Sequence, residues 1–366
     1  MRSDVKHIMA LTRLNGIGPI LSRQLISHCG SAEEVFKSSM SALSKIPQIG
    51  NQKARLIKYD DVAEDVDKEL EFAEKKGVSV LTYLDEAYPR RLNNYEDAPI
   101  ILYYKGTVDL NALRTVAIVG TRKPTDYGIL SCEKIVEDLG KYDPIIVSGM
   151  AYGVDSTAHR SSVRNNIPTI GVLGHGLDRL YPPTNRDLAA KMIENGGLLT
   201  EFPSGTNPDR ENFPMRNRII AALSDVVIVI ESKRKGGSMI TADLANGYFK
   251  DVFALPGRIN DDHSSGCNLL IKSLKASLLE SAKDIAYIMR WEERTDTKKQ
   301  QELFIELNEI ETKIIDHFRS SQEKEITIDK LHYQLQLPVS QLSGLLLELE
   351  FKGMIKSLPG KKYVLT

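Results

Sequence analysis

The sequence has little of what marks a secreted or membrane-bound protein. Its three cysteines are odd in number, far apart and without metal-ligand spacing, which argues against a disulfide framework and fits reduced thiols. The N-terminal stretch MRSDVKHIMALTRL lacks the apolar core of a signal peptide. No apolar run approaches the ~18 residues of a membrane span. These absences predict a cytoplasmic protein of bacterial type with no membrane segment.

An excess of charge of either sign is also missing. The chain has 48 basic and 49 acidic residues, a net charge of -1, so its bulk charge does not indicate a polyanionic partner. Any nucleic-acid site must therefore come from a local patch. Hydrophobic residues make up 42% and charged residues 27% of the 366 residues, which is typical of a soluble globular protein with two or three domains.

The central part of the chain, residues 63–290, carries the pattern of an α/β fold. Between residues 115 and 290, near-continuous apolar runs alternate with helical segments, which predicts a doubly wound, mostly parallel sheet of extended Rossmann-like type. A charged helix is expected to end at Gly77, before two strands that flank the sheet, VSVLTYLD and APIILYYKG. The apolar runs are TVAIVG, PIIVSG, TIGVLG, GLLTEF, DVVIVIE and VFALPG.

The N-terminal residues 1–62 are predicted to be helical, with two glycine-bearing turns. The stretches LNGIGPILSRQLI and IPQIGNQKARLI each place a tight turn before a new helix. They resemble the helix-hairpin-helix module, which holds a DNA backbone with main-chain N–H groups at a helix N-terminus. A purely structural helical bundle gives the same pattern, and both interpretations stay open.

The C-terminal part begins with a polar linker, residues 291–304, and continues with a predicted winged-helix domain, residues 305–366. Its third helix would be the recognition helix, yet it carries Glu348 and Glu350 against Lys352 alone. A helix that reads DNA should be basic. A protein-contact or regulatory role is therefore favoured. The expected elements are helices Glu309–Arg319, Ile328–Leu335 and Pro338–Lys352, followed by a β-hairpin.

The loops after the predicted strands are rich in glycine and in basic residues. Ligands of open α/β sheets bind beyond the carboxyl ends of the strands, where these loops gather. Glycine lets backbone N–H groups approach an anion, and a following helix N-terminus adds positive potential. The loops therefore predict a phosphate-binding rim. Its cations are Arg122, Arg210, Arg216, Arg218, Lys233, Arg234 and Lys235.

The phosphate could belong to a nucleotide, which leaves an enzyme as the alternative function. The Gly-x-Gly-x-x-Gly spacing of dinucleotide sites and the Walker lysine motif are both missing. Nucleoside-monophosphate hydrolases of similar fold carry Pro-Gly-Gly-x-Gly-Thr-x-x-Glu, and the stretch RKGGSMITAD lacks both its proline and its glutamate. A nucleotide-binding or nucleoside-monophosphate-hydrolysing enzyme is thus kept only as the alternative.

Catalytic residues and metal ligands are not expected. Asp155, Asp178 and Glu201 stand near strand ends, where carboxylates more often cap helices or order arginines than act as bases. His159 and His175 have no partner at metal-ligand spacing and are interpreted as hydrogen-bonded loop residues. No cofactor is therefore predicted.

A polynucleotide fits the rim best, because the stretch ENFPMRNRII combines cations with an aromatic ring. Pro214 is expected at the first helical position, with Phe213 just outside the first turn. Arg216 and Arg218 lie where the helix dipole favours negative charge, which a DNA phosphate could supply. Phe213 could then stack on a base. Weaker aromatic candidates are Tyr127, Tyr152 and Tyr181.

These motifs closely resemble the DNA-processing protein A family (DprA, also called Smf). The resemblance runs over residues 115–275 and rests on AIVGTRKPTDYG, VSGMAYGVDSTAH, GVLGHGLDRLYPPTN, TEFP, FPMRNRII, GGSMITA and FALPG in this order. It implies a non-enzymatic protein that binds single-stranded DNA, protects incoming strands in natural transformation and loads RecA recombinase onto them. It also implies a homodimer formed through the Rossmann-like domain.

The resemblance further implies which residues meet DNA. The family's glycine-serine-arginine signature falls on Gly120, Thr121 and Arg122, and its base-contacting phenylalanine falls on Phe213. Two departures are that Gly236 replaces a serine and Pro183 stands where some members have a lysine. The predicted DNA-binding residues are Gly120, Thr121, Arg122, Gly149, Gly153, Asn185, Arg210, Phe213, Arg216, Asn217, Arg218, Lys235, Gly237 and Ser238.

Overall fold

The computed structural model describes residues 3–59, 62–294, 308–321, 325–352, 354–358 and 360–365. The chain divides into two compact units, Met1–Arg294 and Thr295–Thr366. From residue 295 onward, the predicted linker lies outside the described residues. In the described part of the chain, no helix combines the length and apolar character that crossing a membrane requires.

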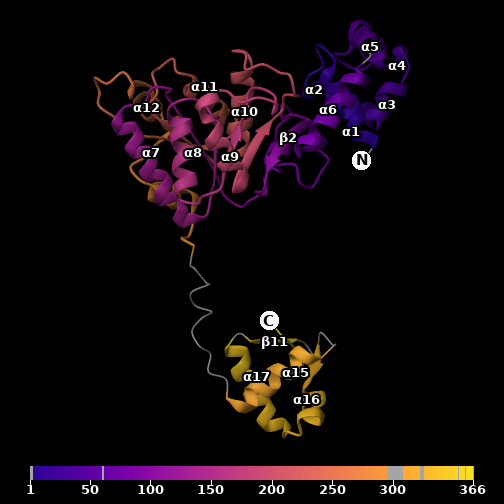
Figure 1. The fold of residues 1–366 in the computed structure, drawn as a ribbon, viewed down its shortest axis with the longest axis vertical. Helices are drawn as coiled ribbons and strands as arrows, with labels where there is room; N and C mark the ends of the chain where they lie inside the picture. Colours follow the sequence, from indigo (N-terminus) through magenta and orange to yellow (C-terminus); the bar gives the residue numbers. More distant parts are fainter. Residues whose placement is uncertain are drawn as a thin grey trace. The chain divides into compact units, whose positions relative to one another are not determined.

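The first unit begins with the predicted helices and glycine turns. Gly16 and Gly50, with φ of 76° and 59°, allow the chain to turn sharply before α2 and at the start of α5. Helix α6 ends at Gly77 in the left-handed conformation, as predicted. These helices pack beside strand β2 (Figure 1). Their bounds are α1 Ser3–Arg13, α2 Pro19–Cys29, α3 Ala32–Lys37, α4 Met40–Ser44, α5 Gly50–Tyr59 and α6 Ala63–Lys76.

A nine-stranded sheet forms the centre of this unit, in the order β1-β2-β6-β5-β4-β3-β7-β8-β9. Strands β3 to β9 pair in parallel, while β1 and β2 add an antiparallel edge, so the mostly parallel sheet is confirmed. The short β9 was not predicted. The bounds are β1 Ser79–Thr82, β2 Ile101–Gly106, β3 Thr115–Gly120, β4 Ile145–Ser148, β5 Thr169–Val172, β6 Gly196–Thr200, β7 Val226–Ile230, β8 Asp251–Ala254 and β9 Ser277–Leu278.

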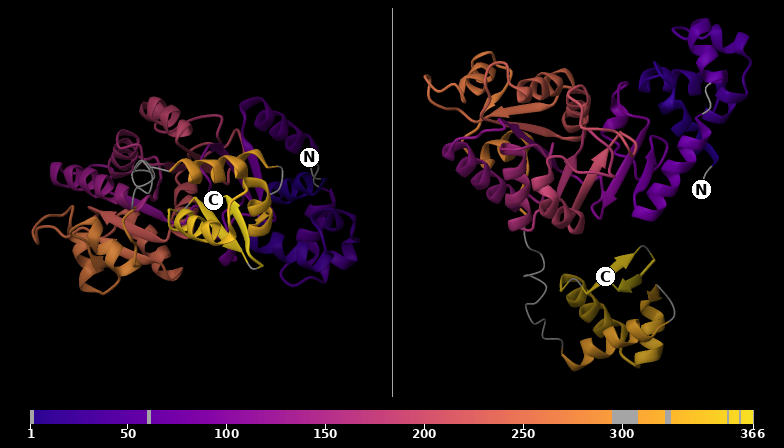
Figure 2. Two further views of the ribbon diagram at one scale, coloured as in Figure 1. Left: turned by 90° about the horizontal axis from the view of Figure 1, so that it is seen from below. Right: turned by 45° about the horizontal axis from the view of Figure 1, so that its top comes forward.

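Helices cover both faces of the sheet, as a doubly wound fold requires (Figure 2). Helices α7 (Asp126–Leu139), α8 (Val154–Arg164), α9 (Arg186–Glu194) and α13 (Ala282–Met289) pack on one face. Helices α10 (Asn212–Leu223), α11 (Gly237–Gly247) and α12 (Ser265–Lys272) pack on the other. Among the described residues of this unit, the chain also forms three short 3₁₀ turns: η1 Leu92–Asn94, η2 Gly140–Tyr142 and η3 Pro183–Asn185.

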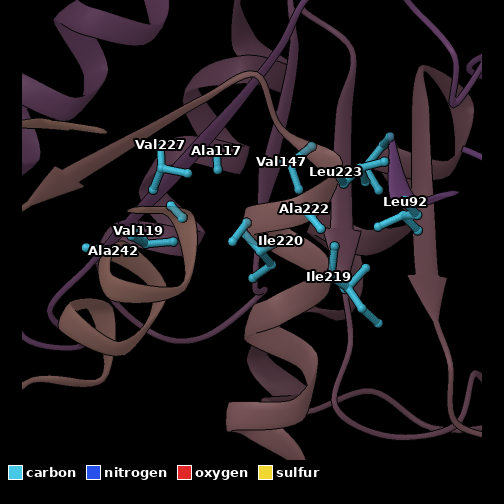
Figure 3. Close-up of a cluster of buried hydrophobic side chains, with 14 of the residues drawn as sticks. Leu92, Ala117, Val119, Val147, Ile219, Ile220, Ala222, Leu223, Val227 and Ala242 are labelled. Carbon is cyan, nitrogen blue, oxygen red and sulfur yellow. The ribbon is translucent and has the colours of Figure 1, made fainter. Parts of the chain in front are cut away.

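Helix α10 is anchored by its C-terminal half. Ile219, Ile220 and Leu223 are buried against side chains of β3, β4 and β7, including Ala117 and Val147 (Figure 3). This burial fixes the direction in which the N-terminal end of the helix points. The start of the helix differs from the prediction.

The helix begins at Asn212 and not at Pro214. Phe213 is therefore its second residue and lies inside the first turn, not outside it. The reason is geometric, since proline lacks only its own N–H, a group that any of the first four helical positions leaves unpaired. Pro214 can thus occupy the third position without removing a hydrogen bond from the helix.

The second unit has the predicted winged-helix order and its own hydrophobic cluster. The three helices fall where the sequence places them, with Pro338 as the residue that caps the third helix. A three-stranded sheet, in the order β10-β12-β11, supports them. The bounds are α15 Glu309–Ser320, β10 Ile326–Thr327, α16 Ile328–Leu335, α17 Val339–Phe351, β11 Ile355–Leu358 and β12 Lys362–Leu365.

Candidate nucleic-acid interface

The candidate site lies where the strand order reverses. Strand β3 has β4 on one side and β7 on the other. The connection from β3 leads to β4, whereas the connection from β7 leads the opposite way to β8, so a crevice forms beyond the carboxyl ends of β3 and β7. We call this cavity of about 540 Å³ the crevice. It is lined by Val119, Gly120, Thr121, Arg122, Ala151, Asp155, Arg210, Phe213, Pro214, Arg216, Asn217, Ile220, Ser232, Lys233, Lys235, Gly236, Gly237, Ser238, Ile240 and Thr241.

Residues at or near the N-terminal ends of three helices, α8, α10 and α11, line the crevice. The capping residues are Gly153, Glu211 and Gly236, and none accepts a hydrogen bond through its side chain from the first turn of its helix. The first N–H groups of each helix have no partner inside that helix. The ends of α10 and α11 therefore favour an anion in the crevice. At the end of α8, the N–H of Val154 donates to the carbonyl oxygen of Thr121, and the first turn carries Asp155.

Basic side chains add to this potential. Within the described residues, Arg122, Arg210 and Lys235 form no ion pair and are available to an incoming anion. Lys233, by contrast, lies 2.8 Å from Asp262 at the surface. The crevice therefore keeps unpaired positive charge.

Two guanidinium groups lie near the ring of Phe213. The guanidinium carbon of Arg122 lies 5.4 Å from the centre of the ring, and that of Arg216 lies 5.9 Å from it. The ring of Tyr181 is 6.4 Å away, and the phenylalanine is partly exposed. This arrangement presents an aromatic ring beside cations, as in proteins that stack nucleobases next to phosphate contacts. Of the weaker candidates, Tyr127 has its hydroxyl group bound to the carbonyl oxygen of Pro256.

Arg216 is buried rather than displayed at the rim. Its Nη1 donates hydrogen bonds to the carbonyl oxygens of Gly149 and Val172, the latter at 2.6 Å. Burial lowers the pKa of Arg216 to about 10, and Asp155 opposes that shift. Burial raises the pKa of Asp155, opposed by the Arg216 charge. This arginine holds the ends of β4 and β5 together. Its positive charge adds to the potential of the crevice from the buried side of the wall.

Arg218 points to the other side of α10. One of its nitrogens pairs with Glu201 and another donates to the carbonyl oxygen of Asp97. Contact with a DNA phosphate would require this buried pair to open. The predicted pair of cations is therefore split, because residues two apart on a helix point about 200° apart.

Most of the predicted DNA-binding residues meet in the crevice. Gly149, Gly153, Asn185 and Arg218 are not among its lining residues. The two glycines support it instead: a side chain on Gly149 would collide with Arg216, and one on Gly153 with the backbone of Arg122. The residues that line it are Gly120, Thr121, Arg122, Arg210, Phe213, Arg216, Asn217, Lys235, Gly237 and Ser238.

Asn185 is buried away from the crevice. Its side-chain amide donates to the carbonyl oxygen of Met150 and to the hydroxyl oxygen of Ser156. It orders the loop that follows β4. Ser232 and Ile240 also line the crevice and were not predicted. The position of Ser232 directly after strand β7 is the one signal in the sequence that could have indicated its place there.

The remaining acids and histidines serve the fold. Asp178 accepts hydrogen bonds from Arg179 and from the backbone N–H of Gly205. His175 is hydrogen-bonded in a loop, as predicted, but His159 lies inside α8, where its Nδ1 is 2.7 Å from Thr169 Oγ1. Among the described residues, no group of three or more acids, histidines and cysteines is placed to hold a metal ion.

Two sequence families match the chain. Residues 79–290 match DNA recombination-mediator protein A, and residues 306–361 match the DprA winged helix domain. Protein Smf of Synechocystis is 33% identical over 99% of this chain and 98% of its own length. DNA processing protein DprA of Streptococcus pneumoniae is 42% identical over 55% of this chain and 71% of its own.

Solved structures give the same relationship. The X-ray structure of DNA processing protein A from Streptococcus pneumoniae matches 79% of this chain and 99% of that chain, with a TM-score of 0.68 and 31% identity. DNA processing protein A from Helicobacter pylori, described for its single-stranded DNA binding mode, matches 59% of this chain and 97% of that chain. Its TM-score is 0.54 and its identity 33%.

Proposed function

This chain belongs to the DNA recombination-mediator protein A family, and we propose that it binds single-stranded DNA in the crevice without catalysing a reaction on it. The observation that carries the proposal is the convergence of the N-termini of α10 and α11 and of unpaired cations around Phe213. Such a combination suits a phosphate and a base side by side, which a single strand offers and a stacked duplex does not.

The division of labour within the crevice follows from exposure and pairing. Arg122, Arg210 and Lys235 would contact phosphates directly, because within the described residues they have no ion-pair partner. Phe213 would stack on a base. Arg216 would hold the ring and the strand ends in place. Binding without sequence preference is expected at these contacts, since every base has a π-face.

The nucleotide-hydrolysing alternative has less support. Asp155 is the one carboxylate among the described residues that line the crevice, and its oxygen accepts a hydrogen bond from the backbone N–H of Ala151. A general base must be free to reach a substrate proton. This carboxylate is engaged beneath Arg216, which fits a supporting role.

Binding to single strands is tested by fluorescence anisotropy with labelled oligo-dT and with a duplex of equal length at low salt. We expect tighter binding of the single strand and at least a several-fold loss for Arg122→Ala, because a phosphate contact disappears. Arg164→Ala is the control, since Arg164 is an exposed arginine in the last turn of α8, 3.4 Å from Glu133. An unchanged affinity in folded Arg122→Ala would contradict the assignment.

We further propose that the chain forms a homodimer that protects single strands and loads RecA recombinase onto them. Membership of a recombination-mediator family supports it. Analytical ultracentrifugation measures the oligomeric state. RecA filament formation on DNA precoated with single-strand binding protein, with and without this chain, measures loading. Equal filament rates in both reactions would contradict the RecA part of the proposal and leave DNA binding intact.

A further inference from the structure

We propose that Glu231 is a positioning residue, which holds Arg122 in place for the phosphate of a bound single strand. This proposal rests on the proposed function, since it concerns how the crevice keeps its phosphate contact. Glu231 directly follows strand β7 and is buried, with 1% of its surface exposed. It is not among the residues that line the crevice. Its contacts are instead with the loop that follows β3, residues 121–125, which we call the arginine loop.

Both ends of the arginine loop are bonded to Glu231. At the start, the backbone N–H of Thr121 donates to the main-chain carbonyl oxygen of Glu231 at 2.8 Å. At the end, the backbone N–H of Thr125 donates to the carboxylate oxygen Oε2 at 2.8 Å, and the Thr125 hydroxyl group donates to Oε1. Arg122 lies between these two attachment points. One residue therefore fixes the entry and the exit of the loop that carries the phosphate contact.

The Thr125 hydroxyl group also joins the arginine loop to helix α7. It caps this helix by accepting a hydrogen bond from the N–H of Gly128 at 3.3 Å, while it donates its own proton to Glu231. A hydroxyl group can do both, whereas an ionised aspartate at the cap could only accept. A Cβ on Gly128 would lie 2.5 Å from Oε2, so the glycine leaves room for the carboxylate. The loop, the helix start and the carboxylate thus fit one another closely.

The start of α8 supports the arginine loop as well. The N–H of Val154 donates to the carbonyl oxygen of Thr121 at 3.1 Å. A Cβ on Gly153 would come within 2.7 Å of the Arg122 Cα, so the two backbones are closely packed. The backbone of Arg122 is therefore held in place, and its guanidinium carbon stands 5.4 Å from the centre of the Phe213 ring.

Glu231 has this role despite two costs to the fold. Its φ of 50° lies in the left-handed region, which is strained for a residue with a side chain. Its carboxylate is buried and, within the described residues, forms no ion pair, although a buried charge is expensive without one. Backbone strain of this kind is concentrated at ligand sites, where the surrounding structure imposes it. The two donors of Thr125 need two acceptor oxygens, which a carboxylate supplies.

Glu231 also connects the arginine loop to the other wall of the crevice. The next residue, Ser232, lines the crevice, and its hydroxyl oxygen accepts a hydrogen bond from the Ser238 hydroxyl group in the first turn of α11 at 2.8 Å. The positions of Arg122 and of the α11 N-terminus are thus set by neighbouring residues of one segment. Contacts that are held in place before binding lose less entropy when the ligand arrives.

The first test replaces the carboxylate by an amide of nearly the same size. In Glu231→Gln, only one terminal atom can accept, so one Thr125 donor loses its partner. In anisotropy titrations of the full-length protein with oligo-dT, we expect the affinity to fall about threefold to fivefold, within the range for one hydrogen bond. The slope of log K against log salt should decrease by up to about 0.7, the value for one phosphate contact on a single strand.

A double variant shows whether Glu231 acts through Arg122. The combination of Arg122→Ala with Glu231→Gln should bind oligo-dT as Arg122→Ala alone does, because the side chain that Glu231 positions is already missing. Residues that act through one contact give such non-additive effects, whereas independent residues give effects that add. Losses that add in full would contradict the positioning role. A role of Glu231 in general stability alone would not produce this coupling.

The threonine tests the same contact from the other side. Thr125→Val removes the hydroxyl group at nearly constant shape and should reproduce the loss of affinity, whereas Thr125→Ser keeps the hydroxyl group and should restore binding. Ser281→Ala is the control, because Ser281 caps α13 in the same unit and is not among the residues that line the crevice. It should lower the melting temperature, as Thr125→Val does, and leave the affinity unchanged. An equal loss of affinity in both would overturn the proposal.

The outcomes separate this inference from the proposed function. No binding of any single strand by the wild type would remove both. A loss of affinity in Arg122→Ala, together with wild-type affinity in Glu231→Gln and Thr125→Val, would overturn the role of Glu231 and leave the crevice in place. Circular dichroism shows which variants are folded. If Glu231→Gln does not fold, Thr125→Val and its combination with Arg122→Ala give the same decision.

Discussion

The crevice of the first unit and the surface of α17 in the second unit differ in chemistry, although each occupies a place where its fold can meet DNA. The crevice combines helix N-termini with arginine and lysine side chains. The exposed surface of α17 carries Val339, Leu347 and Phe351, with 39%, 54% and 84% of their surfaces exposed. A phosphate backbone is attracted by the first set and finds no cation in the second.

The difference teaches that a site, and not a fold name, carries the function. The first turn of α17 contains no acidic residue, so its N-terminus is free of repulsion toward phosphate. Its exposed positions nevertheless offer apolar groups and Glu348. Exposed apolar residues that share one helix surface are typical of protein contacts. This supports the interpretation that the winged helix does not read DNA.

The largest expected effect comes from filling the crevice. Gly237 and Gly344 both lie in helices where an added Cβ meets nothing within 4 Å, one at the crevice and one on α17. Gly237→Trp should weaken oligo-dT binding by about a hundredfold, because it blocks both the phosphate and the stacking contacts. Gly344→Trp should change it little. An equal loss of affinity for the two variants in anisotropy titrations would contradict the assignment of DNA binding to the crevice alone.

A second pair of variants isolates the aromatic contact. Phe213→Ala should cost about 1–3 kcal/mol of binding free energy, the value of one base–aromatic stack. Phe351→Ala removes a more exposed phenylalanine from α17 and should leave the affinity unchanged. Isothermal titration with oligo-dT measures both. A negligible loss for Phe213→Ala would return this ring to a packing role between Arg122 and Arg216.

A third pair concerns salt. Lys235→Ala should lower the affinity several-fold and reduce the slope of log K against log salt by about 0.7, the value for one phosphate contact on a single strand. Lys356, in the wing of the second unit, is the matched exposed lysine. Lys356→Ala should leave the slope as it is in the wild type. A slope that changes for both lysines would show that the second unit also touches DNA.

The smallest expected effect concerns acid stability. Burial lowers the pKa of His159 in the first unit to about 3, so this imidazole stays neutral in the folded state at pH values where the unfolded chain is protonated. The neutral His159 side chain makes its full contribution to the stability of the fold above about pH 6.5. This stability is lost as the pH falls toward 3, because protonation then favours the unfolded chain. The first unit should lose about 1 kcal/mol between pH 8 and pH 6 from this group.

In the second unit, the buried group whose pKa is shifted is a carboxylate, that of Glu311. Burial opposes ionisation of Glu311, but the Lys352 ammonium group and the Asn308 N–H prevail and lower its pKa. The ionised Glu311 therefore adds to the stability of the fold at every pH above the usual pKa of a glutamate. This contribution is lost only when the pH falls through the lowered pKa of the folded state. Differential scanning calorimetry of wild type and His159→Gln should show the smaller pH dependence for the variant. Equal pH dependence between pH 8 and 6 would contradict the role of His159.

The fold was largely predictable because its local signals agree. Apolar runs at strand spacing, the helix end at Gly77 and the proline before α17 all point to the observed elements. Most of the crevice was also predictable, since parallel strands bring the loops after their carboxyl ends to one edge. The orientation of individual side chains was not, as Arg216 and Arg218 demonstrate.

The sequence by itself determined the elements, their order and the set of loops that could meet a phosphate, because periodicity and turn residues act locally. Only the tertiary structure decided which cations stay free. Arg216 is buried by the carbonyl oxygens at the ends of β4 and β5, and Arg218 is drawn to Glu201. These partners come from distant parts of the chain, so no local pattern could reveal them.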